Sequence, residues 1–106
     1  MIDYYICSRD IVGMILSFGD KETEKIFNQI FSKRIPPEIQ KKALTKLILI
    51  DNAEKEEDLK SPPSNRLEGL KGDLSGFYSI RINDQWRIVF KFDQGNCKQV
   101  SVTDYH

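Results

Sequence analysis

The sequence has too few histidines, cysteines and long apolar runs to support several common classes of protein. It contains one histidine, His106, and two cysteines, Cys7 and Cys97, and none of the three belongs to a closely spaced ligand cluster. Zinc sites need several such residues together, so we expect no metal, no other cofactor and two reduced thiols. No apolar run approaches the roughly 20 residues that span a bilayer, and the first residues do not resemble a signal peptide. We therefore expect a cytoplasmic protein that does not enter a membrane.

Net charge is absent as well, because 16 lysines and arginines balance 16 aspartates and glutamates. This balance argues against a protein that coats nucleic acid non-specifically. The charges are unevenly placed, however. Residues 51–58 are mostly acidic, whereas the chain from Lys60 onward has seven basic and five acidic residues. A local cationic site is compatible with this distribution. Such a site suits a target whose binding is helped by another particle, and it suits tight binding to free RNA less well.

The first half of the chain predicts a short strand and two helices. Apolar residues at 14–18 indicate the strand, and Asp20 is a good N-cap for a helix that ends near Arg34. Pro37 suits the first turn of a second helix, where its missing N–H group costs no hydrogen bond. The residues at helical spacing that we expect to be buried are Phe27, Ile30 and Phe31 in the first helix and Ile39, Ala43, Leu47 and Ile50 in the second.

The second half predicts an antiparallel sheet, which follows a polar loop at 53–65. Alternating apolar and polar residues indicate strands at 66–71, 77–82, 86–92 and 98–103, with turn-forming residues between them. Helices followed by a meander of strands make an α+β domain. We expect one domain over residues 1–106, in which an N-terminal strand and a helical hairpin pack on a C-terminal antiparallel sheet.

Parity along neighbouring strands gathers cationic side chains on one face of this sheet. If the apolar positions face the helices, a three-residue turn at 83–85 places Arg81 opposite Arg87 on the other face. Facing arginines repel each other, and a carboxylate is the usual neighbour at such a position. The same parity places Arg87 opposite Thr103 in the last strand. The residues that it brings to this face, or beside it, are Arg81, Arg87, Lys91, Tyr105 and His106.

These side chains suit cleavage of RNA without a metal. The reaction must activate a 2′-hydroxyl, stabilise charge on the phosphorane and protonate the leaving 5′-oxygen. Arginine and lysine can stabilise the charge, histidine can transfer the protons, and tyrosine can position or stack on a base. Each residue also has an ordinary explanation as a solvated cation, a packed tyrosine or a terminal histidine without a role. Their convergence therefore indicates an anion or RNA site.

Four segments resemble the HigB toxins of the RelE superfamily: Arg66–Asp73, Gly76–Ile80, Trp86–Ile88 and Asp104–His106. The resemblance covers residues 14–106, and it makes residues 1–13 an N-terminal extension. It implies a ribosome-dependent endoribonuclease that cuts mRNA. It also implies a HigA-like antitoxin whose helix-turn-helix domain binds DNA, so that this chain reaches DNA only through its partner.

The resemblance implies roles for individual residues. It assigns catalysis to Lys71, Arg87, Asp104, Tyr105 and His106, with Arg87 on the phosphate, and we add Arg81, Lys91 and Glu68 as substrate-binding residues. The chain departs from the pattern at Glu68, where some members have a histidine. If that histidine does acid–base work, His106 must replace it here. Another family arginine falls near Asn83, and Arg81 is the neighbouring residue that can substitute.

Two other functions stay open: a ParE-like toxin that binds gyrase and cuts nothing, and a module that only binds its antitoxin. The terminal tyrosine and histidine favour the enzyme. The antitoxin could cover the cationic face or bind the helical side of the molecule. The charge-rich helices and the acidic residues at 51–58 favour the helical side.

Overall fold

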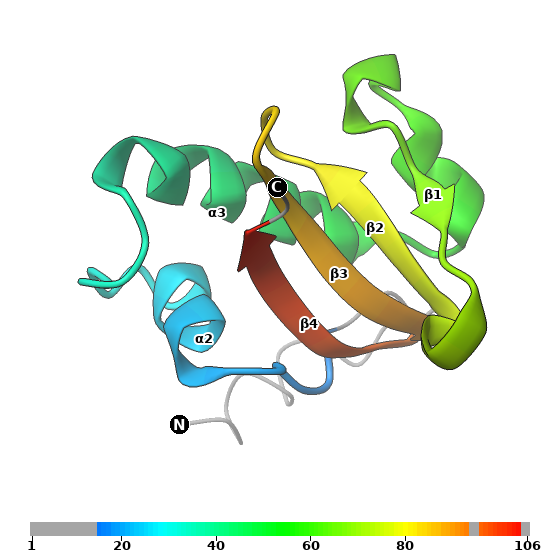
Figure 1. Cartoon of the computed structure of the whole chain (residues 1–106), viewed down its shortest axis with the longest axis horizontal. Helices are drawn as coiled ribbons and strands as arrows, with labels where there is room; N and C mark the ends of the chain where they lie inside the picture. The colour runs from blue at the N-terminus through cyan, green and yellow to red at the C-terminus, as the bar shows by residue number, and fades with distance from the viewer. Residues whose placement is uncertain (1–14, 94–95, 105–106) are drawn as a thin grey trace.

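A four-stranded antiparallel sheet with two helices on one of its faces forms the molecule (Figure 1). The computed structural model describes residues 15–93 and 96–104. The helices are α2 (Lys21–Phe27) and α3 (Pro37–Asn52), and the strands are β1 (Glu68–Gly69), β2 (Phe77–Arg81), β3 (Trp86–Asp93) and β4 (Asn96–Asp104). The strands lie side by side in chain order. This arrangement confirms the α+β class.

Helix α2 begins where the sequence predicts but ends early. The Asp20 carboxylate caps it by accepting a hydrogen bond of 2.7 Å from the backbone N–H of Thr23. The prediction that it continues to Arg34 is wrong, because Gln29 adopts a left-handed conformation with φ of 62°. The N–H of Ile30 then donates to the carbonyl of Lys25, as in a Schellman motif. Ile30 and Phe31, predicted to be buried, are consequently exposed.

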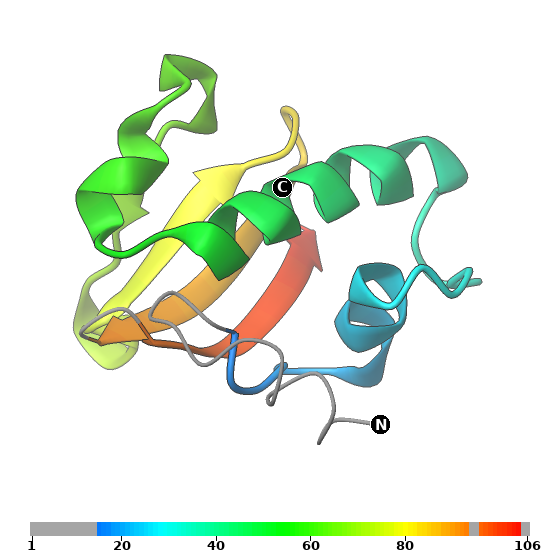
Figure 2. The ribbon, with the colours of Figure 1, turned by 180° about the vertical axis from the view of Figure 1, so that it is seen from behind.

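Helix α3 matches its predicted position and buried stripe. It begins at Pro37, lies across the sheet (Figure 2), and buries the side chains of Ile39, Ala43, Leu47 and Ile50. The loop that follows contains two short 3₁₀ helices, Glu56–Lys60 and Pro63–Asn65. None of the helices in the described part of the chain is long and apolar enough to cross a membrane.

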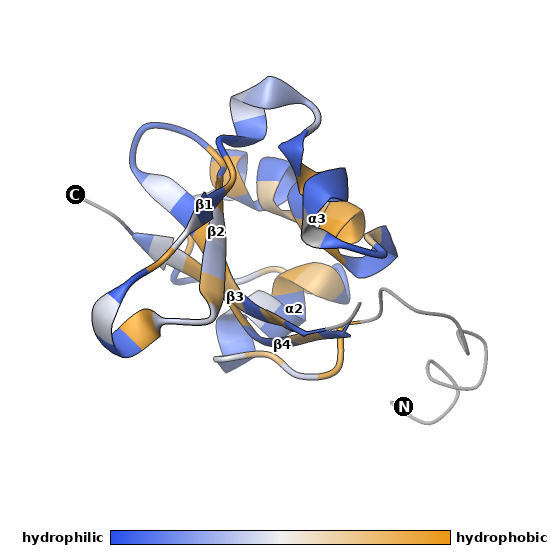
Figure 3. Ribbon diagram, turned by 90° about the vertical axis from the view of Figure 1, so that its right-hand side faces the viewer, coloured by the Kyte–Doolittle hydropathy of each residue, from blue (hydrophilic) through white to orange (hydrophobic). Residues whose placement is uncertain are grey.

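The register of the central strands follows the predicted parity. Ile80 pairs with Ile88 and Arg81 with Arg87. The face that carries Ile80 and Ile88 packs against the helices and forms the core. Its apolar positions are coloured orange in Figure 3. The largest fully buried side chains of the core are Phe90, Leu47, Ile50, Leu59, Ile80 and Ile88.

The outer strands differ from the sequence pattern. Strand β1 pairs over two residues only, within the predicted 66–71. Between β3 and β4, Arg87 pairs with Thr103 as predicted, but an irregularity between Val89 and Lys91 shifts the register beyond it. The predicted strand at 14–18 is reduced to two isolated parallel bridges, Ile15 with Cys97 and Phe18 with Val100, and its first residue lies outside the described residues.

Candidate functional site

The turn between β2 and β3 sets the two arginines opposite each other. The backbone N–H of Ile82 donates to the carbonyl of Trp86 at 2.8 Å and closes the hairpin. The Asn83 side-chain oxygen accepts hydrogen bonds of 2.8 Å from the N–H groups of Gln85 and Trp86. Asn83 thus has a structural role in the turn, and Arg81 and Arg87 face each other on the sheet surface away from the helices.

Arg87 is the most firmly held cation of this face. Its Nε donates to the hydroxyl of Ser79 at 2.8 Å, and its Nη2 donates to the backbone carbonyl of Arg66 at 2.8 Å. The same Nη2 lies 3.3 Å from Oε1 of Glu68, and only 12% of the Arg87 side chain is exposed. Because the Glu68 side chain is 62% exposed, the pair presents its carboxylate to solvent.

Arg81 is held differently, by an ion pair with the carboxylate of Asp84 in the turn. Each of the facing arginines therefore has its own acidic partner, Glu68 for Arg87 and Asp84 for Arg81. Their repulsion is relieved within the protein, so a bound anion is not required to explain the pairing.

The two lysines of the expected site lie toward the other end of the strands. Lys91 pairs with Phe77, and Lys71 is one residue beyond Leu70, whose N–H donates to the Phe77 carbonyl. Four strand positions separate Phe77 from Arg81, which is roughly 13 Å at about 3.3 Å per residue. Both lysines are exposed, and neither forms an ion pair with a described residue. The face is thus an elongated cationic strip with the two arginines at one end and the two lysines toward the other, and the Arg87 side chain reaches Ser79 and Glu68 between them.

The C-terminal residues are only partly described. Asp104 pairs with Trp86, which places it at the arginine end of the sheet but on the helix side. Its carboxylate accepts a hydrogen bond of 3.1 Å from the side-chain amide of Gln85. It also lines a pocket of about 340 Å³ with Asp20, Arg34 and other residues. Tyr105 and His106 lie outside the described residues, so their catalytic assignment stays a prediction.

Metal and thiol chemistry find little support within residues 15–93 and 96–104. No group of three or more histidine, cysteine, aspartate or glutamate side chains there could hold a metal ion. Cys97 is a free thiol, as predicted, but it is fully buried, and burial raises its pKa to about 12. Cys97 therefore stays protonated and shielded near neutral pH. Cys7 lies outside the described residues.

Sequence reasoning missed Ser79 and the contact between Glu68 and Arg87. Ser79 was visible only as a small residue next to Arg81 on the same face, and nothing in its type marks it as a partner of Arg87. The sequence draws attention to Glu68 only through the resemblance, because some family members have a histidine there. The distance of 3.3 Å between Glu68 and Arg87 depends on the pairing of β1 with β2, which the sequence pattern does not specify.

Comparisons with known proteins find a matching family model and relatives over most of the chain. A family model described as the RelE-like toxin of type II toxin–antitoxin system HigB matches residues 16–106. Toxin HigB-1 of Vibrio cholerae serotype O1 is 41% identical over 83 residues, which are 77% of this chain and 87% of that toxin. Endoribonuclease HigB of Proteus vulgaris is 31% identical over 93 residues, which are 88% of this chain and 100% of the relative.

Solved structures share the fold. The YoeB–YefM complex from Staphylococcus aureus contains a chain that is 29% identical with a TM-score of 0.56, over 87% of this chain and 94% of that chain. YafQ from E. coli is 16% identical with a TM-score of 0.54, over 87% of this chain and 91% of that chain. The second likeness shows the fold alone.

Proposed function

Because the chain belongs to the HigB family of RelE-like toxins from type II toxin–antitoxin systems, we propose that it is an endoribonuclease that cuts mRNA during translation on the ribosome. The observation that carries the proposal is Arg87, fixed by Ser79 and Arg66 beside the exposed Glu68 carboxylate. The Proteus vulgaris relative, itself named an endoribonuclease, supports the same activity.

Arg87 keeps N–H groups that form no hydrogen bond with a described residue, and phosphate binding requires such donors. Its hydrogen bonds to described residues use Nε and Nη2, whereas Nη1 donates to none of them. We propose that the two N–H groups of Nη1 on this fixed guanidinium bind the scissile phosphate. A donor that is already in place stabilises charge in the transition state without reorganising. Lys91 then binds a neighbouring phosphate along the strip, and Arg81 extends the strip at the other end. We also assign Lys71 to a neighbouring phosphate, which changes its role from the catalysis that the resemblance implies to substrate binding.

Glu68 is the described carboxylate best placed to act as a base next to that phosphate. It lies 3.3 Å from Arg87 and is largely exposed, so a substrate 2′-hydroxyl can approach it. We propose that the Glu68 carboxylate accepts the proton of this hydroxyl. The role of Glu68 then changes from substrate binding to catalysis. His106 then protonates the leaving 5′-oxygen, and Tyr105 stacks on a base. Asp104 orients the chain end through its contact with Gln85.

The overall charge of the chain supports the proposed dependence on the ribosome. A neutral chain gains little from the release of counterions on free RNA, so a second surface must supply the affinity. One transcript should be cut rapidly when it is translated and should stay intact as naked RNA at the same enzyme concentration. Equal cutting of both would contradict the proposal. Mapping mRNA 3′ ends in cells after induced expression separates this function from a gyrase-binding toxin, which would leave transcripts uncut.

The partner that we propose is a HigA-like antitoxin with a helix-turn-helix domain. Membership of a type II toxin–antitoxin family supports an antitoxin, and a solved neighbour is a toxin–antitoxin complex. Contact of this chain with DNA is then indirect, through the antitoxin.

A further inference from the structure

An apolar groove lies between the end of α2 and the first turns of α3, on the helical side of the molecule. It has a volume of about 400 Å³ and is lined by Ile26, Gln29, Ile30, Phe31, Pro37, Gln40, Lys41 and Leu44. Its mouth holds two of the most exposed large apolar side chains in the described part of the chain, Ile30 at 55% and Phe31 at 62%. Exposed apolar side chains that gather on one surface are a feature of interaction sites.

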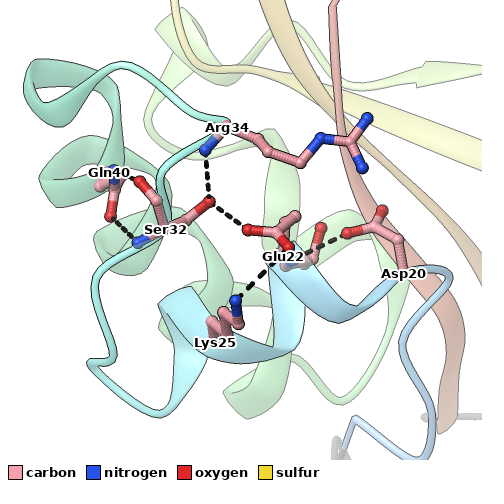
Figure 4. A network of polar contacts seen from close by, with 7 residues as sticks. Asp20, Glu22, Lys25, Ser32, Arg34 and Gln40 are labelled. Carbon is pink, nitrogen blue, oxygen red and sulfur yellow. Dashed lines mark hydrogen bonds and ion pairs between the residues drawn. The ribbon is translucent and has the colours of Figure 1, made fainter.

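The loop that carries these two residues is held in place before any partner arrives. Figure 4 shows Ser32, the next residue, bonded on several sides. Its N–H donates to the Gln40 side-chain oxygen at 3.1 Å, and the Gln40 amide donates back to the Ser32 carbonyl at 2.8 Å. The Ser32 hydroxyl donates to Glu22, which lowers the pKa of that carboxyl. The groove is therefore preorganised, and binding into it costs little ordering of the loop.

The charges around the groove indicate the kind of partner. Residues 24–48 carry six basic and two acidic side chains in a chain of zero net charge. Lys41 lines the groove, and Lys33 and Lys42 are exposed nearby in the sequence. None of these three lysines forms an ion pair with a residue that the structure describes. An apolar groove with unpaired cations suits an amphipathic acidic segment of a protein.

We infer that this groove receives an amphipathic acidic segment of the antitoxin, which inserts large apolar side chains between Ile30, Phe31 and Leu44. Aspartates and glutamates on its flanks meet Lys33, Lys41 and Lys42. The inference rests on the antitoxin partner of the proposed function, and it does not depend on the cleavage chemistry. The groove lies on the helices, whereas Arg87 and Glu68 lie on the opposite face of the sheet.

The test is titration calorimetry of the cognate antitoxin, which is co-expressed and then purified, with variants of the full chain. It measures the dissociation constant of each complex. Phe31→Asp places a negative charge in the groove, next to the acidic residues of the antitoxin segment. It should weaken binding at least roughly 30-fold, as expected for the centre of an interface. Lys41→Glu should weaken binding roughly three- to tenfold and make it less sensitive to salt. Leu16→Asp is the matched control, since Leu16 is 47% exposed and does not line the groove.

Thermal melting of each variant checks that it folds. If Phe31→Asp does not fold, Lys41→Glu still tests the inference. Unchanged affinity of a folded variant would overturn the inference. A photoreactive phenylalanine analogue in place of Phe31 should crosslink to the antitoxin. Crosslinks confined to a second copy of the chain, or to ribosomal RNA, would also overturn it. If the wild-type chain cuts no RNA, the proposed activity fails while the dissociation constants still decide the docking site.

Discussion

At the scale of single residues, Ser79 decides how Arg87 is presented. Its buried hydroxyl accepts from Nε of Arg87 at 2.8 Å, while Nη1 donates to none of the described residues. Without the hydroxyl the guanidinium keeps its charge but loses one of the contacts that set its orientation. Ser79 is therefore a positioning residue, which acts through Arg87.

We expect Ser79→Ala to lower the rate of mRNA cleavage on saturating ribosomes about tenfold, and Arg87→Ala to lower it about a hundredfold. The double variant should cleave no more slowly than Arg87→Ala alone, because both changes act on one interaction. Ser64→Ala is the control, since Ser64 is an exposed serine of the loop before β1. Rate losses that simply multiply in the double variant would show that Ser79 acts separately from Arg87.

At the scale of elements, the short helix α2 is the feature that creates the groove. The end of α2 depends on Gln29, whose backbone is in the left-handed conformation. Glycine adopts this conformation more easily than a residue with a side chain does. The conformation persists because the buried Ser32 is bonded to Glu22 and Gln40 on both sides of the loop. The local strain at Gln29 is thus balanced by tertiary contacts.

Gln29→Gly should stabilise the chain by about 0.5–1 kcal/mol, because relief of the strain at positive φ exceeds the added entropy of the unfolded chain. The measurement is the free energy of unfolding from a urea titration. Gln29→Ala is the matched control and should give no gain, because alanine has the same difficulty at this φ. Equal stability of the glycine and alanine variants would mean that Gln29 carries no strain.

At the scale of the whole molecule, the described core begins at Ile15. The Ile15 side chain is buried, and its backbone N–H donates to the carboxylate of Asp51 at 2.9 Å. The family model begins at the next residue, Leu16. Residues 1–13 lie outside the described residues, so their assignment as an extension stays a prediction.

A chain that begins at Met14 should fold, melt within a few degrees of the full chain, and cut mRNA at an unchanged rate. The expected shift is small because the prediction treats residues 1–13 as an extension, and changes outside a core usually alter stability by less than about 0.5 kcal/mol. Ile15→Asp in the same background is the contrasting variant and should unfold the protein. A truncated chain that folds but does not cut would place the extension in the function.

The sequence by itself determined the features that neighbouring residues encode. Helical spacing identified the buried stripe of α3, and alternation identified the core face of β2 and β3. A three-residue turn then placed Arg81 opposite Arg87. These features are predictable because periodicity and turn length act within a few residues of the chain.

Only the tertiary structure decided the features that join distant segments. The sequence predicted a longer α2, and the contacts of Ser32 with Glu22 and Gln40 oppose that extension. The carboxylate beside Arg87 comes from β1, 19 positions earlier in the chain, and pairs with it only because β1 adds to the edge of β2. Such contacts depend on how elements pack in space, and no local pattern of residues specifies that packing.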